Sequence, residues 1–135
     1  MSLHESPTVL VAEDSAAIRS ILAFLLRGRG YRVLECANGT EALDRTRSDV
    51  PDAVILDVMM PGPTGFDVCQ ALKSDPATRA IPVMILTAVT EGAGKSDDYW
   101  KTLSGADDFL TKPFKAVDIL ARVARLVAKG AVNSP

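Results

Sequence analysis

The sequence contains a single histidine, His4, which lies in a polar segment at the N-terminus. A histidine-based metal site and a Ser–His or Cys–His catalytic pair are therefore excluded from the body of the chain. The only two cysteines, Cys36 and Cys69, do not have C-x-x-C metal spacing, and with no sign of secretion they favour a reduced, cytosolic setting. Any chemistry must come from carboxylates, lysine, serine and threonine.

Long hydrophobic runs and an excess of one charge are also missing. The longest apolar run covers residues 21–26, whereas a membrane span needs about 20 residues, and residues 1–7 lack the apolar core of a signal peptide. Fifteen basic and 17 acidic residues give a net charge of −2, without the basic field that nucleic-acid binding needs. We expect one cytoplasmic domain over residues 7–129, with short tails at 1–6 and 130–135, that binds neither nucleic acid nor membrane.

Five short β-rich runs, each bounded by turn residues, recur along the chain. They cover residues 8–13, 31–36, 52–57, 82–87 and 107–111. The first, third and fourth runs are almost continuous in Val, Ile and Leu. Such runs are typical of strands that helices cover on both faces.

Helical periodicity fills most of the intervals. The first helix has an apolar face formed by Ile18, Ile21, Leu22, Leu25 and Leu26. Asn38 with Glu41, and Thr64 with Asp67, have the spacing of capping boxes that open the second and third helices. The remaining helices are expected at residues 96–103 and 116–128.

Strand–helix alternation repeated five times predicts an α/β fold with a parallel sheet and helices on both of its faces. Right-handed crossovers favour a flavodoxin-like (βα)5 three-layer sandwich with a five-stranded sheet of order 2-1-3-4-5. The functional groups of such a sheet lie at the carboxyl ends of its strands, near the switch point between the first and third strands.

Three acids, a hydroxyl and an amine end these strands. Glu13 and Asp14 follow the first, Asp57 ends the third, Thr87 ends the fourth, and Lys112 ends the fifth. Three neighbouring carboxylates repel one another, and a divalent cation removes that penalty. Oxygen ligands without Cys or His suit Mg²⁺. The set is suited to a phosphoryl group, with a carboxylate as nucleophile.

Helix capping is the alternative explanation for some of these residues, because Asp and Ser are common N-caps. For Asp14-Ser15 the two explanations stand about equal. For Asp57 the capping explanation is much weaker, because the chain runs through residues 58–63 before Thr64 caps the next helix.

In this order, the residues resemble the signature of the response-regulator receiver domain of two-component signalling. The resemblance covers about residues 8–128. It includes the acidic pair Glu13-Asp14, the segment ILDVMMPGPTG around Asp57, the pair Thr87-Ala88, and GADDFLTKPF at residues 105–114. Together, these four motifs in register on the expected elements are highly specific.

The resemblance implies that Asp57 is the phosphoacceptor, which attacks the phosphorus of a phospho-histidine on a partner and becomes an acyl phosphate. It also implies that Asp14, Asp57 and the backbone carbonyl of Met59 ligate Mg²⁺ (or Mn²⁺), and that Glu13 acts through a bound water. Lys112 would pair with the phosphoryl group. Glu13 is a modest departure, since Asp is commoner at that position.

The resemblance further implies a conformational switch. Thr87 would move to bond the phosphoryl oxygens, the small Ala88 would leave room for them, and Phe109 would turn inward, although Phe109 can also be a plain core residue. The face formed by the fourth helix, fifth strand and fifth helix would then signal to a partner. The family also implies a cis Lys112–Pro113 bond.

Two positions beyond the strand ends bear on the lifetime of the phosphoryl group. In the family, side chains at the positions of Met59 and Val89 influence the access of the hydrolytic water. Both are apolar here, which predicts a comparatively long-lived phosphoryl group. Thr87 and Lys112 lie 25 positions apart, a few more than is usual, and the excess falls in residues 89–96, as a tolerated insertion or a determinant of partner choice.

Competing functions fit less well. A haloacid-dehalogenase-like aspartyl phosphatase would need an acid at Met59 and its nucleophile on the first strand, and a flavin binder would need a phosphate loop after that strand.

The resemblance implies a non-enzymatic phosphoacceptor with slow autodephosphorylation, monomeric or weakly dimeric when phosphorylated. Its partners would be a histidine kinase or histidine phosphotransfer protein, and a downstream target or relay protein. We expect a stand-alone receiver; a receiver excised from a longer regulator is the alternative.

Overall fold

The computed structural model describes residues 6–88 and 104–133. Within them five parallel strands form one sheet in the order β2-β1-β3-β4-β5, which confirms the predicted fold and strand order. The strands are β1 (Thr8–Ala12), β2 (Arg32–Cys36), β3 (Ala53–Asp57), β4 (Val83–Ala88) and β5 (Asp108–Lys112). Each boundary lies within one residue of the predicted one.

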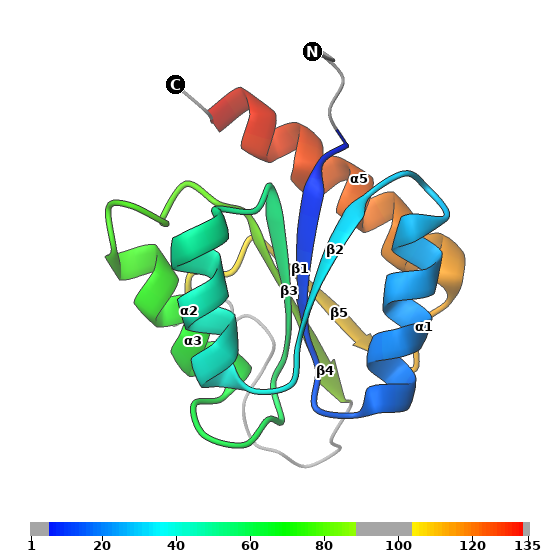
Figure 1. Cartoon of the computed structure of the whole chain (residues 1–135), viewed down its shortest axis with the longest axis horizontal. Helices are drawn as coiled ribbons and strands as arrows, with labels where there is room; N and C mark the ends of the chain where they lie inside the picture. The colour runs from blue at the N-terminus through cyan, green and yellow to red at the C-terminus, as the bar shows by residue number, and fades with distance from the viewer. Residues whose placement is uncertain (1–5, 89–103, 134–135) are drawn as a thin grey trace.

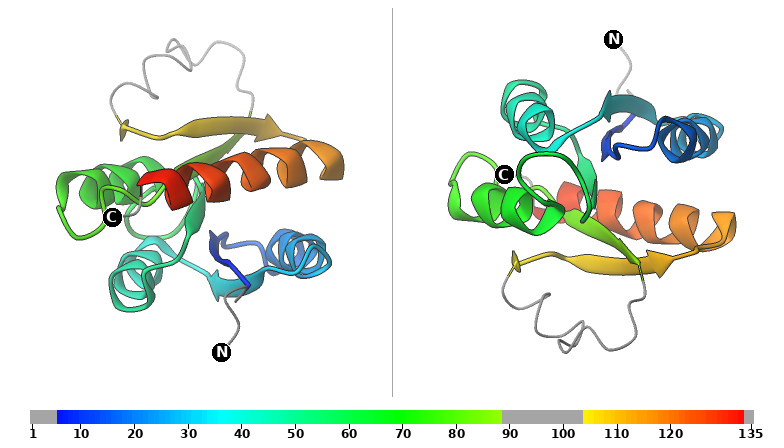
Figure 2. Two further views of the ribbon diagram at one scale, coloured as in Figure 1. Left: turned by 90° about the horizontal axis from the view of Figure 1, so that it is seen from above. Right: turned by 90° about the horizontal axis from the view of Figure 1, so that it is seen from below.

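Helices cover both faces of this sheet, so the molecule has three layers (Figure 1; Figure 2). The described part of the chain contains α1 (Ala16–Arg27), α2 (Gly39–Asp49), α3 (Gly65–Ser74) and α5 (Ala116–Asn133). Helices α1 and α5 pack on one face, and α2 and α3 pack on the other. The helix expected at residues 96–103 lies outside the described residues.

The strands explain the nearly continuous apolar runs, because consecutive side chains enter opposite halves of the core. The half against α1 and α5 receives Val9, Val11, Ala53, Ile55, Met84 and Leu86. The half against α2 and α3 receives Leu10, Ala12, Val54, Leu56, Val83 and Ile85. Both halves are fully enclosed in the central strands, and this fixes the register of β1, β3 and β4.

Two helices differ from their predicted form. In α1 the apolar face was predicted one residue too wide, because Ile21 is 57% exposed while Leu22 and Leu26 are buried. The predicted end of the last helix at residue 128 was wrong, because α5 continues to Asn133. Gly130 suggested a helix end, but a Cβ there would lie 2.9 Å from the Asp52 carbonyl oxygen. A glycine is needed for this close helix–sheet approach, and the helix passes through it.

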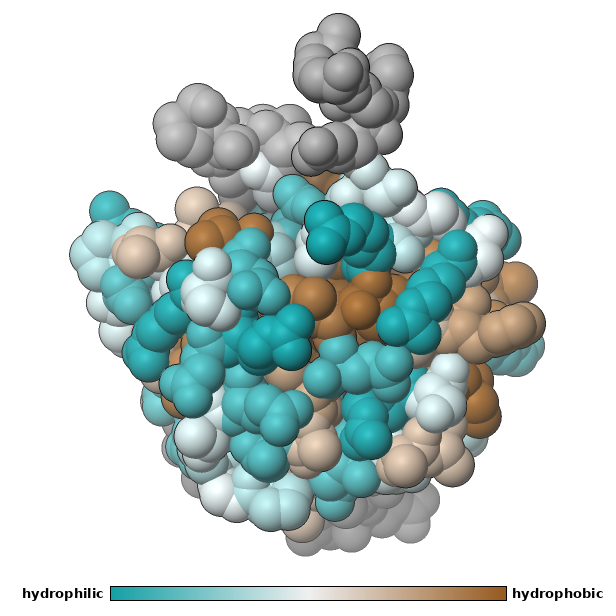
Figure 3. Space-filling model, in the orientation of Figure 1, coloured by the Kyte–Doolittle hydropathy of each residue, from teal (hydrophilic) through white to brown (hydrophobic). Residues whose placement is uncertain are grey.

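Polar residues cover most of the face that carries α2 and the edge strand β2 (Figure 3). In β2 only Cys36 is buried, as expected for a strand paired on one side. Among the described helices, none combines the length and the apolar composition needed to cross a bilayer.

Side-chain caps determine where α2 and α3 begin. Thr64 and Asp67 form the reciprocal capping box that the sequence predicted. Asn38 accepts a bond from the Glu41 backbone N–H (2.8 Å), but the Glu41 carboxylate accepts from the Ala37 N–H instead of closing the box. Both predicted helix starts are nevertheless confirmed.

The loop that joins β3 to α3 is held by two close glycine contacts. The Gly65 N–H donates to the Val58 carbonyl (3.1 Å), and a Cβ on Gly65 would lie 2.4 Å from the Asp57 carbonyl oxygen. A Cβ on Gly39, at the start of α2, would lie 2.3 Å from the Pro63 carbonyl oxygen. Larger residues at either position would push this loop away from the end of β3.

At the opposite end of the sheet, Asp107 joins four elements. Its carboxylate accepts bonds from the Val83 backbone N–H (2.8 Å), the Lys73 ammonium (2.8 Å) and the Lys129 ammonium (2.5 Å). Burial acts to raise the pKa of Asp107, but these bonds outweigh it and lower the pKa below its ordinary value. The carboxylate therefore ties α3, β4 and α5 to the start of β5.

We predict that Gly65→Ala destabilises the protein by about 2 kcal/mol, because the new methyl group would collide with the Asp57 backbone. In an unobstructed helix the same change stabilises by roughly 0.5–1 kcal/mol. Gly28→Ala is the matched control, since its Cβ would make ordinary 3.4 Å contacts. Urea unfolding of the two variants measures the difference, and equal stabilities would contradict the proposed close contact.

We predict that Asp107→Asn lowers the free energy of unfolding by about 2 kcal/mol at pH 7, because hydrogen bonds to a charged acceptor are lost. The folded pKa of Asp107 lies below the unfolded one, so its contribution is complete above the ordinary value of 3.8 and falls as the pH drops through the lowered pKa. The difference between wild type and variant should therefore shrink towards pH 3 in urea titrations. A difference independent of pH would refute this role of the charge.

Candidate functional site

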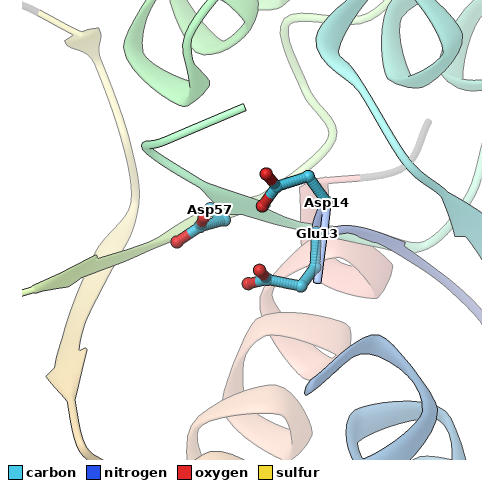
Figure 4. A group of neighbouring side chains, drawn as sticks. All are labelled: Glu13, Asp14 and Asp57. Carbon is cyan, nitrogen blue, oxygen red and sulfur yellow. The ribbon is translucent and has the colours of Figure 1, made fainter. Parts of the chain in front are cut away.

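Three carboxylates converge at the carboxyl edge of the sheet, where the sequence placed them. Glu13 and Asp14 directly follow β1, and Asp57 is the last residue of the neighbouring strand β3. One oxygen from each carboxylate lies within 4.8 Å of the others. Figure 4 shows the side chains of Glu13 and Asp14 extending towards the side on which Asp57 lies.

The cluster has a buried floor and an open rim. Glu13 is 1% exposed and Asp57 is 4% exposed, whereas Asp14 is exposed. A ligand from solvent can therefore approach over Asp14 and meet the carboxylates of Glu13 and Asp57 below it.

Lys112 reaches the two buried acids from β5. Its ammonium lies 2.8 Å from Asp57 Oδ1 and 3.0 Å from Glu13 Oε2. Burial acts to lower the pKa of Lys112, but the hydrogen bonds to Asp57 and Glu13 outweigh it and raise the pKa above its ordinary value. The amine therefore stays protonated at neutral pH. The Lys112–Pro113 peptide bond is cis, as the resemblance implied.

The surroundings of Glu13 disfavour ionisation of its carboxyl group. Burial raises the pKa of its carboxyl group above the ordinary value, and the charge of Asp57 adds to the rise. Bonds from Lys112 and from the Ser15 backbone N–H (3.2 Å) oppose it. Among the described residues, the cluster thus concentrates negative charge that the Lys112 ammonium offsets only in part.

Ser15, not Asp14, caps helix α1. The Ser15 hydroxyl accepts a bond from the Ile18 backbone N–H (3.3 Å). At the end of β3 the corresponding cap of α3 is Thr64. The capping explanation of the Asp14-Ser15 pair is thus confirmed for Ser15, but it accounts for neither the Asp14 nor the Asp57 side chain.

The donor set fits a hard divalent cation. Three carboxylates and one ammonium leave a formal charge of −2, and every candidate ligand atom is oxygen. Mg²⁺ prefers such ligands and usually keeps several of its waters, which the open rim at Asp14 permits. Met59, whose carbonyl is the expected further ligand, follows Asp57 by two residues, and its side chain is 72% exposed.

The two expected switch residues lie on the strands beside the acids. Thr87 is partly exposed near the end of β4, and its hydroxyl donates to the Ala88 carbonyl (3.3 Å). Phe109 on β5 is partly buried and packs against Phe66 of α3, with ring centroids 6.0 Å apart. Val89 and the expected insertion at residues 89–96 lie outside the described residues.

One residue at the site was missed in the sequence. Arg19 of α1 donates a hydrogen bond of 2.7 Å to the backbone carbonyl of Glu13. The one feature of the sequence that could have drawn attention to Arg19 is that it directly follows Ile18, which lies on the apolar face of the predicted helix. No residue pattern marks a bond to a backbone carbonyl, so only the folded structure could show it.

Comparison with known sequences gives one consistent assignment. Residues 9–124 match the family model of the response regulator receiver domain. The chain is 44% identical over 121 residues to response regulator PleD of Caulobacter vibrioides, covering 90% of this chain and 26% of PleD. It is 41% identical over 119 residues to the DNA-binding response regulator MtrA of Mycobacterium tuberculosis, covering 87% of this chain and 50% of MtrA. The chain thus spans about half of one relative and a quarter of the other.

A solved receiver domain is similar to this chain in structure. The receiver domain of the sensor histidine kinase PA1611 from Pseudomonas aeruginosa superimposes with a TM-score of 0.79 at 25% identity, covering 91% of this chain and 98% of that one. That domain is described with a magnesium ion coordinated in its active site cleft. With the matched family model, the sheet order and the acidic cluster in agreement, the chain belongs to the response regulator receiver domains of two-component signalling.

Proposed function

We propose that Asp57 accepts a phosphoryl group from a phospho-histidine of a partner protein. The observation that carries this proposal is the geometry around Asp57. Its carboxylate is almost fully buried, lies 2.8 Å from the Lys112 ammonium, and shares an oxygen cluster with Glu13 and Asp14. A nucleophile beside a fixed cation and a potential metal site has what phosphoryl transfer requires, because charge on the transferred oxygens must be neutralised.

In the proposed reaction one Asp57 oxygen forms a bond to phosphorus while the phosphorus–nitrogen bond of the partner's phospho-histidine breaks. The electron pair of that bond remains on the imidazole nitrogen, and the product is an acyl phosphate on Asp57. Lys112 exchanges its bond to the Asp57 carboxylate for one to a phosphoryl oxygen, so its positive charge stays at the reacting centre.

Mg²⁺ or Mn²⁺ would neutralise the phosphoryl oxygens during the transfer. We propose that the carboxylates of Asp14 and Asp57 and the carbonyl of Met59 hold the ion directly, and that Glu13 acts through a bound water. The acid cluster supports this assignment, as does the magnesium described in the PA1611 receiver domain.

We propose that phosphorylation changes the surface formed by β5 and α5, together with the helix expected at residues 96–103. Thr87 would turn to bond the phosphoryl group, and Phe109 would move with it. Strands β4 and β5 are neighbours in the sheet, where Thr87 pairs with Thr111 and Ile85 with Phe109. This pairing supports a coupled movement of Thr87 and Phe109. A downstream protein that prefers one of the two surfaces would read the state.

We propose that the protein is cytoplasmic and that its partners are a histidine kinase or histidine phosphotransfer protein and a downstream target or relay protein. The net charge of −2 argues against direct nucleic-acid binding by these residues. We propose a receiver domain over residues 7–129 that is monomeric or weakly dimeric when phosphorylated. It consumes its phosphoryl group by slow autodephosphorylation and is not a turnover enzyme. Because PleD and MtrA are longer than this chain, we keep two alternatives, a stand-alone receiver and a receiver domain from a longer regulator.

We predict that incubation with acetyl phosphate and Mg²⁺ adds one phosphoryl group, measured by intact mass. The adduct should disappear in Asp57→Asn, because the nucleophilic oxygen pair is lost, and in the presence of a metal chelator. Asp44→Asn, a change at an exposed acid of α2, is the control and should be labelled like the wild type. Labelling of Asp57→Asn to the wild-type extent would refute the proposed phosphoacceptor.

We also predict that Met59→Asn accelerates loss of the phosphoryl group several-fold, because an amide can orient the attacking water by hydrogen bonding and a thioether cannot. The decay is followed by intact mass after removal of the phosphodonor. Met59→Leu keeps the position apolar and should decay at the wild-type rate. Rapid decay of the wild-type adduct, unchanged in Met59→Asn, would contradict the proposed role of this position.

A further inference from the structure

The peptide unit between Glu13 and Asp14 carries two of the three clustered acids. Regular pairing in β1 ends at Ala12, but the Glu13 N–H still donates to the Cys36 carbonyl of β2 (3.0 Å). The Glu13 carbonyl, in contrast, has left the sheet where the chain turns into α1. Because Glu13 is 1% exposed, this carbonyl needs a partner from within the protein.

Arg19 supplies that partner. Its Nη1 donates to the Glu13 carbonyl oxygen over 2.7 Å, a short bond with a charged donor. A second nitrogen of the same guanidinium, Nε, lies 3.6 Å from Oε1 of Glu35 on β2. The side chain of Arg19 is only 20% exposed, so packing and the two partners together restrict its position.

Glu35 in turn has two basic partners. Besides Arg19 it pairs with Arg27, whose Nη2 lies 3.2 Å from Glu35 Oε2. Arg27 is 54% exposed and bonds the Val33 carbonyl and Glu35, both of β2. Arg19 and Arg27 thus share one acid on β2, but in the described contacts only Arg19 also bonds the backbone of the acidic pair.

We infer that Arg19 is a positioning residue for divalent-metal binding, which it supports by holding the Glu13–Asp14 peptide unit in place. This inference rests on the proposed metal site. The Glu13 side chain has further bonds to Lys112 and to the Ser15 N–H, but the exposed Asp14 side chain is less restrained by packing. Its direction therefore depends on the backbone, and rotation of this peptide unit would turn Asp14 away from Asp57.

The test is calorimetric titration of the whole chain with MgCl2. Arg19→Met keeps the aliphatic bulk of the side chain but removes its donors, and should weaken Mg²⁺ binding about tenfold, the lower end of the loss typical for residues that orient metal ligands. Arg27→Met is the matched control, because it removes the other partner of Glu35 without touching Glu13, and should bind Mg²⁺ within twofold of the wild type. Arg19→Lys retains one charged donor and should recover part of the affinity.

A second measurement separates positioning from general damage. In acetyl phosphate labelling at increasing Mg²⁺, Arg19→Met should need about tenfold more Mg²⁺ for half the maximal rate. At saturating Mg²⁺ it should reach the wild-type maximum. A lowered maximum that Mg²⁺ does not restore would overturn the inference in favour of a purely structural role, as would an equal loss of affinity in Arg27→Met.

Failure of this inference is distinct from failure of the proposed function. If the wild type binds Mg²⁺ and is labelled on Asp57, but Arg19→Met binds Mg²⁺ equally well, Arg19 has no positioning role and the proposed function stands. If the wild type itself binds no divalent cation, the metal site is wrong, and the inference falls with it.

Discussion

The ammonium of Lys112 holds together a cluster that would otherwise repel itself. It lies within 3.0 Å of both buried acids, and it reaches them from β5 although β4 separates that strand from β3. With the exposed Asp14 included, the charge is only partly balanced, and burial raises the pKa of Glu13. Such a cluster is stabilised when a divalent cation binds, so the mutual repulsion that costs stability without a cation also favours binding of a metal.

The remaining fold divides the site into two unequal halves. The half from β1 and β3 is fixed: close contacts at Gly39 and Gly65 hold the loop after Asp57, and Arg19 holds the peptide after Glu13. The half from β4 and β5 is anchored at its far end, where Asp107 bonds the start of β4 and the amines of α3 and α5. Near the site this half is only partly buried, as Thr87 shows. A fixed half that carries the acids, next to a half that is less restrained, is the arrangement that a ligand-driven switch requires.

Much of this could be predicted from the sequence, because the relevant signals are local. Apolar runs predicted the five strands within one residue, and the rule that parallel strands end at one edge brought Glu13, Asp14, Asp57 and Lys112 together. Nonlocal side-chain contacts with the backbone could not be predicted. Gly130 suggested a helix end locally but serves close packing against Asp52.

No pattern marked Arg19, and the motif that contains Asp107 did not reveal its contacts, because the partners of both residues are backbone groups and amines of other elements. The identity of such a partner depends on how the elements pack, which the spacing of residue types along the chain does not record. Their roles are therefore visible only once α1 and α5 are seated on the sheet.

The energetics of the proposed switch depend on how weakly Thr87 is held before phosphorylation. Its bond to the neighbouring Ala88 carbonyl is 3.3 Å long, which is longer than the roughly 2.5–3.0 Å usual for a hydroxyl donor. A bond from the same hydroxyl to an anionic phosphoryl oxygen would be shorter and roughly twice as strong. The exchange therefore favours the phosphorylated arrangement, opposed mainly by the packing of Phe109 against Phe66, which must yield if Phe109 moves. Because an aromatic contact of this kind contributes about 0.5–1.5 kcal/mol, the proposed switch requires the phosphoryl group to favour the second arrangement by more than this contact is worth.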